Sequence, residues 1–573
     1  MSKVLQVEAV RTMRMVMLGS LVMFFVIQAG CAVAQAGDRE AIQTVTIGEN
    51  AEFRMNGKPF LPIMVWLQDS AHFPKLQASG INTVAGYFWN EAEGKGQDET
   101  KSLAEYAPRV REAGFYFVSP YLSHQAEAMK QVAGMTNLLA WIQGDEPDMP
   151  ETKSDGVVEA GKQMRVNAAT PFARIIDGVT NSWTVVDPLE GGEFTIKPAA
   201  AVTVESVGVW ATVSKGLAVA KEVTFWGDGK ELLKVTLENK AGEQKFALPA
   251  AATLKELKVT VQSAYPGEQK WGSIGEVAGY DAAGKNVLVS KPYTVPKRAE
   301  EAVAAEYRAI KALDATRPVL MTFTAHFMKE FSGRFDAAAK AKVYPKYVQY
   351  CDAVGFDTYP VYGYNMPNKM YQVADGVTEL RALAGPKRPV YAWIETNKGS
   401  QWTAYESQIE VKPMYTRAEV WMALIRGARG IAYFTHAWKP EYSQFALTEE
   451  MVKELARLNG QITRLAPALL ATPSKRAISL AMADGLAGHW MATEHEGSLY
   501  VFAQNMDLGQ DAAKLKQGQD ITPRAGSATI RVEGLKAGTK IEVVDEGRTI
   551  TAEDGQFADT FGPLAEHVYR LAL

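Results

Sequence analysis

Apolar residues follow two patterns that alternate along this chain. Short and nearly continuous apolar runs, such as Leu138 to Ile142, are typical of strands that are covered on both faces. Between these runs, apolar residues recur at helical spacing, as they do at Val303, Tyr307 and Ile310. The predicted strands are Leu61 to Leu67, Ile81 to Trp89, Phe115 to Leu122, Leu138 to Ile142, Val319 to Thr324, Ala353 to Tyr359, Pro389 to Glu395 and Gly430 to Thr435.

Eight such strands, interleaved with eight helices, predict an α/β fold of the TIM (β/α)8 barrel type. An Asn56-Gly57 pair predicts a hairpin that closes the floor of the barrel. Thr416 and Glu419 predict a capping box that begins the seventh helix.

The alternation is interrupted once and ends before the end of the chain. After the fourth strand it gives way to short β-type runs with a hairpin turn at Asp228-Gly229, which predict an inserted β-sandwich. After the eighth helix, apolar and polar residues alternate between Gly-rich turns and predict a C-terminal β-sandwich. The predicted division is a signal peptide at 1–36, barrel halves at 37–170 and 297–472, an inserted domain at 171–296 and a C-terminal domain at 473–573.

Composition describes an ordinary globular protein. A chain of 573 residues is too long for one core, and its net charge of −4 is not the basic excess that nucleic-acid binding requires. No segment after the N-terminus is apolar enough to span a bilayer. The two cysteines, Cys31 and Cys351, offer no disulfide framework.

The N-terminus predicts export. Arg11 and Arg14 precede an apolar run from Met15 to Ile27 and then small residues, which together are typical of a bacterial signal peptide. We therefore expect a periplasmic or extracellular protein. Ala29-Gly30-Cys31 resembles the end of a bacterial lipoprotein signal, but Gln28 replaces the usual Leu, so a lipid anchor at Cys31 stays an open alternative.

Two of the predicted strands end in carboxylates. The fourth runs into Asp145-Glu146-Pro147, and the seventh ends at Glu395. In a barrel of this type the active site lies at the carboxyl ends of the strands. Carboxylates ringed by aromatic side chains suit sugars, whose C–H faces stack on rings while their hydroxyls bond to polar groups. The candidate substrate-binding residues are Asp145, Trp66, Tyr87, Trp89, Tyr121, His326, Asp357, Tyr359, His436 and Trp438.

Glycoside hydrolysis requires two carboxyl groups that flank one bond. One is protonated and donates to the leaving oxygen, and the other is ionised and attacks the anomeric carbon or activates water. The fourth and seventh strands face each other across an eight-stranded barrel. Glu146 and Glu395 are therefore the predicted catalytic pair.

This layout resembles the clan A retaining glycoside hydrolases, which include β-galactosidases, cellulases and β-mannanases. The resemblance covers the barrel alone. It implies that Glu146 is the acid/base, that Glu395 is the nucleophile, and that Trp438 lies under the reacting sugar. It also implies that Tyr359 bonds the nucleophile.

One position departs from that pattern. The superfamily places Asn directly before the acid/base, but this chain has Asp145 there. An ionised Asp accepts hydrogen bonds, donates none, and raises the pKa of a neighbouring acid. Asp145 could therefore serve a different sugar 2-position. It could also act with Glu146, as paired acids do in substrate-assisted hydrolases of 2-acetamido sugars.

The insert carries a resemblance of its own. The segments at 173–178 and 271–277, together with Trp183, resemble the opening and closing strands of discoidin-like (factor 5/8 C-terminal type) domains. Many of these bind carbohydrate and hold a structural calcium ion. The alternative is a domain that only supports the loop after the fourth strand.

The sequence lacks the motifs that mark other kinds of active site. The chain has no HExxH, CxxC or GxSxG motif and no nucleotide-binding glycine loop after a strand, so we expect no catalytic metal or cofactor. The leading hypothesis is an exported glycoside hydrolase that works by double displacement through Glu146 and Glu395. The alternatives are a non-catalytic carbohydrate-binding barrel and a substrate-assisted hydrolase that uses Asp145 and Glu146.

Overall fold

A computed structural model describes residues 39–87, 102–153, 155–167, 170–212, 216–268, 271–291, 293–331 and 333–572. The predicted signal peptide with Cys31 lies outside these residues, and so do Trp89 and the end of the predicted second strand.

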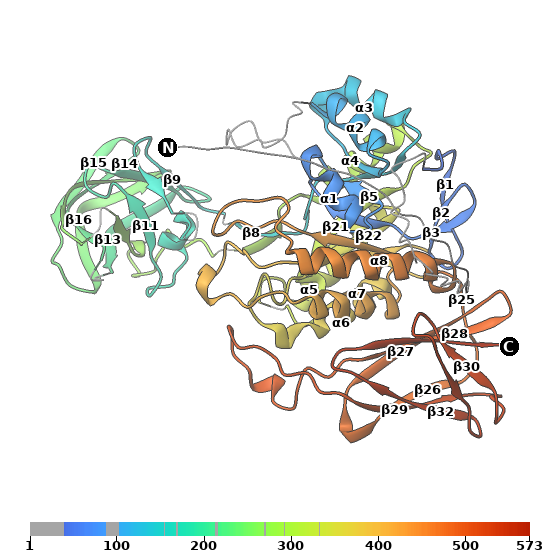
Figure 1. Ribbon diagram of the computed structural model, residues 1–573. Coiled ribbons are helices and arrows are strands. Elements are labelled where there is room, and N and C mark those ends of the chain that lie inside the picture. Colours follow the sequence, from blue (N-terminus) through green and yellow to red (C-terminus); the bar gives the residue numbers. More distant parts are fainter. Residues whose placement is uncertain are drawn as a thin grey trace, which may run out of the picture.

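The centre of the protein is a closed barrel of eight parallel strands, as the sequence predicts (Figure 1). Its strands follow one another around the barrel in chain order, and every neighbouring pair is parallel. They are β4 (Ile63–Trp66), β5 (Thr83–Ala85), β6 (Tyr116–Pro120), β7 (Leu138–Ile142), β21 (Val319–Thr324), β22 (Ala353–Asp357), β23 (Val390–Glu395) and β24 (Gly430–Phe434).

Helices cover the outside of the barrel because each strand buries both faces. In β23, Tyr391 and Trp393 face the barrel interior, while Val390, Ala392 and Ile394 pack against the helices. The helices are α1 (Phe73–Ala78), α2 (Leu103–Glu112), α3 (Ala126–Ala133), α4 (Glu300–Leu313), α5 (Ala337–Tyr347), α6 (Tyr371–Ala384), α7 (Pro413–Ile425) and α8 (Glu449–Leu469).

The seventh helix begins earlier than the sequence predicts. α7 starts at Pro413, the first helical position, where a missing N–H costs nothing. Thr416 and Glu419 are fully buried within the helix, so they form no capping box. The Thr416 hydroxyl instead donates to the backbone carbonyl of Glu395 at 2.9 Å.

A small antiparallel sheet closes the amino-terminal end of the barrel. It consists of β1 (Val45–Ile47), β2 (Phe53–Met55) and β3 (Lys58–Phe60). The β2–β3 turn is Asn56-Gly57, and both residues have positive φ, as a tight hairpin requires. Its apolar face joins the cluster that fills the barrel interior.

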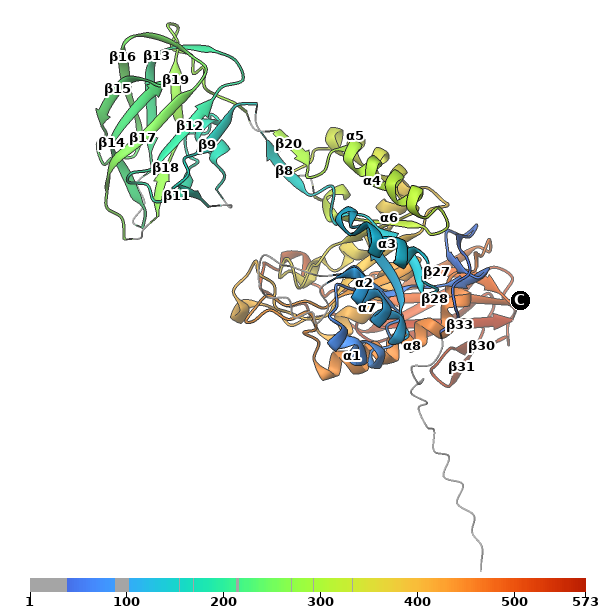
Figure 2. The same cartoon turned by 90° about the horizontal axis from the view of Figure 1, so that it is seen from above.

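A β-rich domain is inserted through a two-stranded ribbon. β8 (Pro150–Lys153) leads out of the barrel and pairs with β20 (Tyr293–Pro296), which leads back. Figures 1 and 2 show the domain apart from the barrel, at the end of this ribbon. Its strands form an eight-stranded and a three-stranded sheet over one apolar core. They are β9 (Val157–Ala160), β10 (Arg165–Val166), β11 (Thr184–Asp187), β12 (Glu193–Lys197), β13 (Val202–Ala211), β14 (Ala218–Gly227), β15 (Lys230–Thr236), β16 (Gly242–Leu254), β17 (Leu257–Tyr265), β18 (Gly272–Ile274) and β19 (Val277–Tyr280).

The C-terminal region forms a six-stranded and a three-stranded sheet. These sheets contain β25 (Thr472–Pro473), β26 (Ile478–Met482), β27 (Gly488–His495), β28 (Ser498–Asn505), β29 (Gly526–Val532), β30 (Lys540–Val543), β31 (Arg548–Thr551), β32 (Gln556–Phe561) and β33 (Glu566–Ala572).

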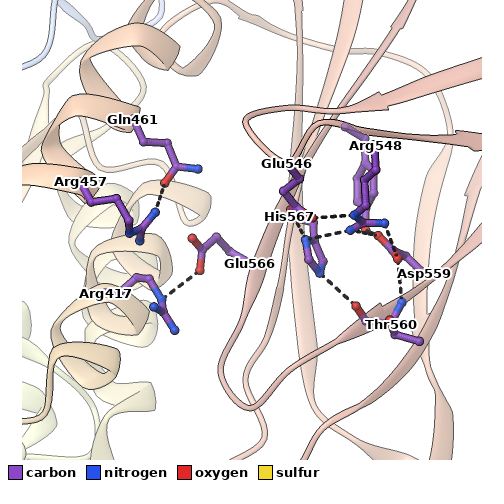
Figure 3. Close-up of polar contacts among 10 residues, drawn as sticks. Arg417, Arg457, Gln461, Glu546, Arg548, Asp559, Thr560, Glu566 and His567 are labelled. Atoms are coloured by element: carbon purple, nitrogen blue, oxygen red, sulfur yellow. Dashed lines mark hydrogen bonds and ion pairs between the residues drawn. The ribbon is translucent and has the colours of Figure 1, made fainter. Parts of the chain in front are cut away.

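The six-stranded sheet packs against α7 and α8. Trp421 of α7 stacks on Phe502 of β28, with ring centroids 6.3 Å apart. Figure 3 shows Arg417 of α7 reaching Glu566 of β33, at 3.4 Å between Nε and Oε2. Within the described part of the chain, no helix is both long and apolar enough to cross a bilayer.

Candidate functional site

The turn that follows β7 is held in a strained conformation. β7 is buried along its whole length, and the Gly144 N–H donates to the Glu306 carboxylate of α4 at 2.9 Å. Glu146 has a φ of 48°, in the left-handed region that residues with side chains rarely adopt. Such strain persists only where neighbouring contacts fix it, and it is common at functional sites.

Asp148 anchors this turn from inside the protein. It is fully buried, and it accepts hydrogen bonds from the Thr324 N–H at 2.9 Å, the Thr324 hydroxyl at 2.7 Å and the Tyr344 hydroxyl at 3.0 Å. Burial raises the pKa of Asp148 to about 7 even though these donors favour its charge. Asp148 is not among the site residues predicted from the sequence, and its nearness to Asp145 and Glu146 was the only signal for it.

Three carboxyl groups meet at the carboxyl end of the barrel. Glu146 hydrogen-bonds to Asp357, the last residue of β22. Burial, and then the charge and hydrogen bond of Glu146, raise the pKa of Asp357 well above its usual range. Because two neighbouring carboxylates repel each other, Asp357 keeps its proton, which lies in its hydrogen bond with Glu146.

Asp145 borders this pair. Its side chain reaches solvent, but protein surrounds its other sides. This loss of solvation, and then the charge of Glu146, raise the pKa of Asp145 to about 7, while nearby Lys297 acts in the opposite direction. The barrel mouth therefore keeps protons on carboxyl groups near neutral pH, as general acid catalysis requires.

Tyr359 lies beside the three carboxyl groups. Burial and the charges of Asp357, Asp145 and Glu146 raise the pKa of Tyr359 well above its usual range. The phenol therefore stays protonated, and its O–H is a hydrogen-bond donor. Its ring also packs on Phe434, with centroids 5.0 Å apart.

Glu395 has a different environment from Glu146. It is fully buried, and its two oxygens accept hydrogen bonds from the backbone N–H groups of Val361 at 2.8 Å and Tyr362 at 2.5 Å. The side chain of Glu419, also fully buried, approaches it from α7. Burial raises the pKa of Glu395, while the Glu419 side chain and these two N–H groups act in the opposite direction.

Two carboxyl pairs lie at this end of the barrel. Glu146 pairs with Asp357, and Glu395 pairs with Glu419. The predicted catalytic pair takes one member from each, and the charges of Asp357, Glu395 and Glu146 all act on the hydroxyl of Tyr364. The catalytic pairing of Glu146 with Glu395 stays a prediction.

Aromatic rings line the barrel mouth beside these carboxyl groups. Trp66 packs edge-on against Trp393 at 5.1 Å between centroids. Trp438, which is 38% exposed, stacks almost parallel on Phe434 at 5.9 Å. Trp402, on the loop after β23, is 63% exposed, and it is not among the site residues predicted from the sequence. The polar stretch around Trp402 was the only signal of an exposed loop.

The two predicted histidines form hydrogen bonds with other residues of the protein. His436 is buried, which lowers its pKa to about 4, and its Nε2 lies 3.1 Å from the carbonyl oxygens of both Trp66 and Leu67. It therefore joins the ends of β24 and β4 as a neutral ring that donates through Nε2. His326 lies 3.0 Å from the Thr324 hydroxyl, which in turn binds Asp148.

The remaining predicted site residues lie at the edge of the site or away from it. Tyr87 is buried and packs on Tyr106 of α2, at 4.9 Å between ring centroids, in the core between barrel and helices. Tyr121 is partly buried directly after β6, and its N–H donates to Ile142. Trp89 lies outside the described residues.

The described residues also contain a candidate cation site in the inserted domain. Glu276 is 1% exposed, and its Oε1 accepts from the Gly178 N–H at 3.0 Å, while its Oε2 has no partner. Burial, and then the nearby charge of Asp177, raise the pKa of Glu276 to about 7. No group of three or more His, Cys, Asp or Glu side chains in the described ranges is arranged to hold a metal ion. Backbone carbonyls would therefore have to complete a calcium site here.

Comparison with known proteins gives partial structural likenesses. No protein-family model matches the chain, and no curated protein matches it. One similar solved structure is a family 32 carbohydrate-binding module of Clostridium perfringens NanJ in complex with galactose, at 15% identity over 22% of this chain and 97% of that chain, with a TM-score of 0.19. Another is an Anoxybacillus alpha-amylase, at 10% identity over 48% of this chain and 57% of that chain, with a TM-score of 0.30. A third is a family 30 endoxylanase from Clostridium papyrosolvens, at 12% identity over 49% of this chain and 62% of that chain, with a TM-score of 0.26.

Proposed function

We propose that this protein hydrolyses glycosidic bonds at the carboxyl end of its barrel, with Glu146 as the general acid. The observation that carries this proposal is the group of three carboxyls, Asp145, Glu146 and Asp357, of which Glu146 is held at a strained φ of 48°. The proton in the hydrogen bond between Asp357 and Glu146 is available to the leaving oxygen of a glycoside. Trp66 and Trp438 supply ring faces on which a sugar stacks.

The attacking group distinguishes two mechanisms. Double displacement needs a carboxylate oxygen that faces the anomeric carbon, and Glu395 is the candidate from the clan A layout. However, Glu395 is fully buried, and its oxygens are bound by Val361 and Tyr362. Substrate assistance instead needs only a donor to the leaving oxygen and a second carboxylate at the sugar 2-position. Asp145 and Glu146 are adjacent and reach solvent, which favours a 2-acetamido sugar as the substrate.

In the substrate-assisted reaction, the acetamido carbonyl oxygen forms a bond to the anomeric carbon as the glycosidic bond breaks. Glu146 gives its proton to the leaving oxygen. Ionised Asp145 stabilises the positive charge that develops on the acetamido N–H. Water then attacks the anomeric carbon and gives its proton to Glu146, and the acetamido group returns to its original form. Tyr359, which stays protonated, orients the sugar by donating a hydrogen bond.

Activity on natural glycans tests the general proposal. Wild-type protein should release sugars from at least one member of a broad polysaccharide and oligosaccharide panel, and Glu146→Gln should lower the rate about a hundredfold or more, because general acid catalysis contributes about 10²–10⁴-fold. Glu127→Gln, an exposed change on α3, is the matched control. Binding without any product release would favour the non-catalytic carbohydrate-binding alternative.

Inhibitors then separate the two mechanisms. A thiazoline analogue of a 2-acetamido sugar should inhibit, and Asp145→Asn should lose activity. A fluorosugar adduct trapped on Glu395 would instead establish double displacement with that residue as the nucleophile.

We further propose that the inserted domain binds carbohydrate and holds a structural calcium ion. The unpartnered Glu276 Oε2 and the nearby Asp177 supply anionic ligands of the kind that calcium prefers. The ribbon of β8 and β20 begins only a few residues after Glu146, so a glycan held by this domain would stay close to the barrel mouth. Export through the N-terminal signal, and a lipid anchor at Cys31, remain proposals from the sequence.

A further inference from the structure

Trp402 is an exposed aromatic residue on a braced loop. It is 63% exposed, compared with 38% for Trp438 and 37% for Trp490. Aromatic side chains usually bury most of their area, so a tryptophan fixed in solvent beside other aromatic rings is an expected feature of a ligand platform.

The loop that carries Trp402 has little freedom, because one side chain holds it together. Gln408 accepts through Oε1 from the N–H groups of Gly399 at 2.8 Å and Ser400 at 3.1 Å. It donates through Nε2 to the carbonyl oxygens of Ser400 at 2.8 Å and Thr403 at 3.0 Å. All of these partners lie within three residues of Trp402, so the ring is presented from a preorganised backbone.

This loop is also joined to the loop after β24. The backbone N–H of Trp438 donates to the Gly399 carbonyl at 2.7 Å, and the Lys439 ammonium donates to the Thr403 carbonyl at 2.6 Å. The two loops therefore carry their exposed tryptophans, Trp402 and Trp438, as one unit.

A continuous series of rings connects the two tryptophans. Trp402 meets the edge of Tyr362 at 6.3 Å between centroids, and Tyr362 meets Phe434 at 5.4 Å. Phe434 stacks under Trp438 at 5.9 Å and also packs on Tyr359 beside the carboxyl groups. The series thus begins at the acid cluster and ends at the open face of Trp402.

Trp402 also lies close to the loop after β22. The ring comes so near to Gly363 that a Cβ built there would lie 3.5 Å from the indole. One side of the indole is therefore supported by Tyr362 and Gly363, and the other side is open to solvent. A supported ring with one open face is the geometry on which a sugar ring stacks.

We propose that Trp402 is an outer sugar-binding platform, separate from the position of Trp438, and that the protein acts on chains of several sugar units. This inference rests on the proposed hydrolysis at the carboxyl groups. The occupant is a carbohydrate chain because the platform continues the aromatic lining of that site.

Affinity measured against chain length tests this proposal. The probes are chito-, xylo-, malto- and manno-oligosaccharides of one to six units, titrated by calorimetry into the Glu146→Gln variant so that they are not consumed. In the series that binds, affinity should increase with length. Adding Trp402→Ala should remove that increase, so that the longer probes bind about tenfold more weakly, a change of 1.4 kcal/mol. The affinity for the one-unit probe should stay within about twofold.

Two further variants serve as comparisons. Trp438→Ala should weaken binding at every length. Trp490→Ala, on β27 of the C-terminal region with 37% exposure, should leave every affinity unchanged. Equal affinities with and without Trp402 at all lengths, or equal losses for one unit and for six, would overturn the outer platform while the proposed hydrolysis stands. If none of the four series binds while wild-type protein releases sugars from the broad panel, the outer platform is overturned and the proposed hydrolysis stands.

Discussion

The buried pair of Glu395 and Glu419 gives a prediction that separates a structural role from a catalytic one. At pH 5, Glu395→Gln should destabilise the barrel, while Glu419→Gln should leave its stability nearly unchanged. Both substitutions keep the shape of the side chain, so they differ mainly in hydrogen bonding.

The effect of Glu395→Gln follows from its two donors. The Glu395 oxygens accept from the Val361 and Tyr362 N–H groups. Glutamine has one oxygen and one NH2 group, so one buried backbone N–H would face another donor. A buried donor left unsatisfied costs about 1–3 kcal/mol.

Glu419 has the opposite hydrogen-bonding role. Neither of its oxygens has a well-aligned partner among the described residues, and Glu395 is the neighbour whose charge acts on it. Burial, and then the charge of and hydrogen bond with Glu395, raise the pKa of Glu419 well above its usual range. Glu419 therefore supplies the proton of the pair, and the NH2 group of glutamine replaces that donor.

The dependence on pH gives the second half of the prediction. Because the folded protein keeps a proton on Glu419 that the unfolded chain releases, wild-type stability falls as pH rises above the ordinary glutamate value of about 4.5. Glu419→Gln removes this loss. The free energy of unfolding of the variant, relative to that of wild type, should therefore rise by about 1.4 kcal/mol per pH unit above about pH 4.5, for as long as folded Glu419 keeps its proton.

Urea unfolding at pH 5, 6 and 7 measures these differences, with calorimetry to resolve the barrel transition from those of the β domains. Hydrogen exchange at Val361 and Tyr362 should become faster in Glu395→Gln and stay unchanged in Glu419→Gln. If Glu395→Gln is as stable as wild type at pH 5, or if the Glu419→Gln and wild-type curves stay parallel with pH, the assigned pairing is wrong. Loss of turnover without loss of stability in Glu395→Gln would mark Glu395 as the nucleophile.

Three further predictions concern the carboxyl groups elsewhere in the chain. Activity should rise as pH passes about 7, where Asp145 ionises, and Asp145→Asn should remove this limb of the pH–rate profile. Asp148→Asn should cost about 1–3 kcal/mol in urea unfolding and lower kcat more than it raises KM, because the turn that holds Glu146 loses its buried anchor. Calcium removal by a chelator should lower the melting temperature of the inserted domain, and Glu276→Gln should make that temperature insensitive to calcium.

Much of the barrel could be predicted from the sequence. β21 has the predicted bounds of Val319 to Thr324, because six residues buried on both faces leave a continuous apolar and β-branched run. β22 ends at Asp357 rather than at the predicted Tyr359, since the aromatic pattern continues past the last ladder bond. Such apolar runs predict which residues are buried, but they do not show at which residue the strand ends.

The site was less predictable than the fold. Sequence position places Asp145 and Glu146 correctly at the end of β7, and it places Asp357 at the end of β22. It could not reveal that Glu395 turns toward Glu419, because Thr416 and Glu419 fit an exposed capping box equally well. The helix begins at Pro413 instead, and that choice depends on packing between α7 and β23, which no local pattern records.

The most direct test of the central claim is the source of oxygen in the product. Wild-type protein, incubated in H2¹⁸O with the glycan that it consumes, should release a new reducing end that carries one ¹⁸O atom per bond cleaved. Glu146→Gln should form these labelled ends about a hundredfold or more slowly. Absence of new reducing ends on every glycan that the protein binds, or new ends without ¹⁸O, would contradict hydrolysis at these carboxyl groups.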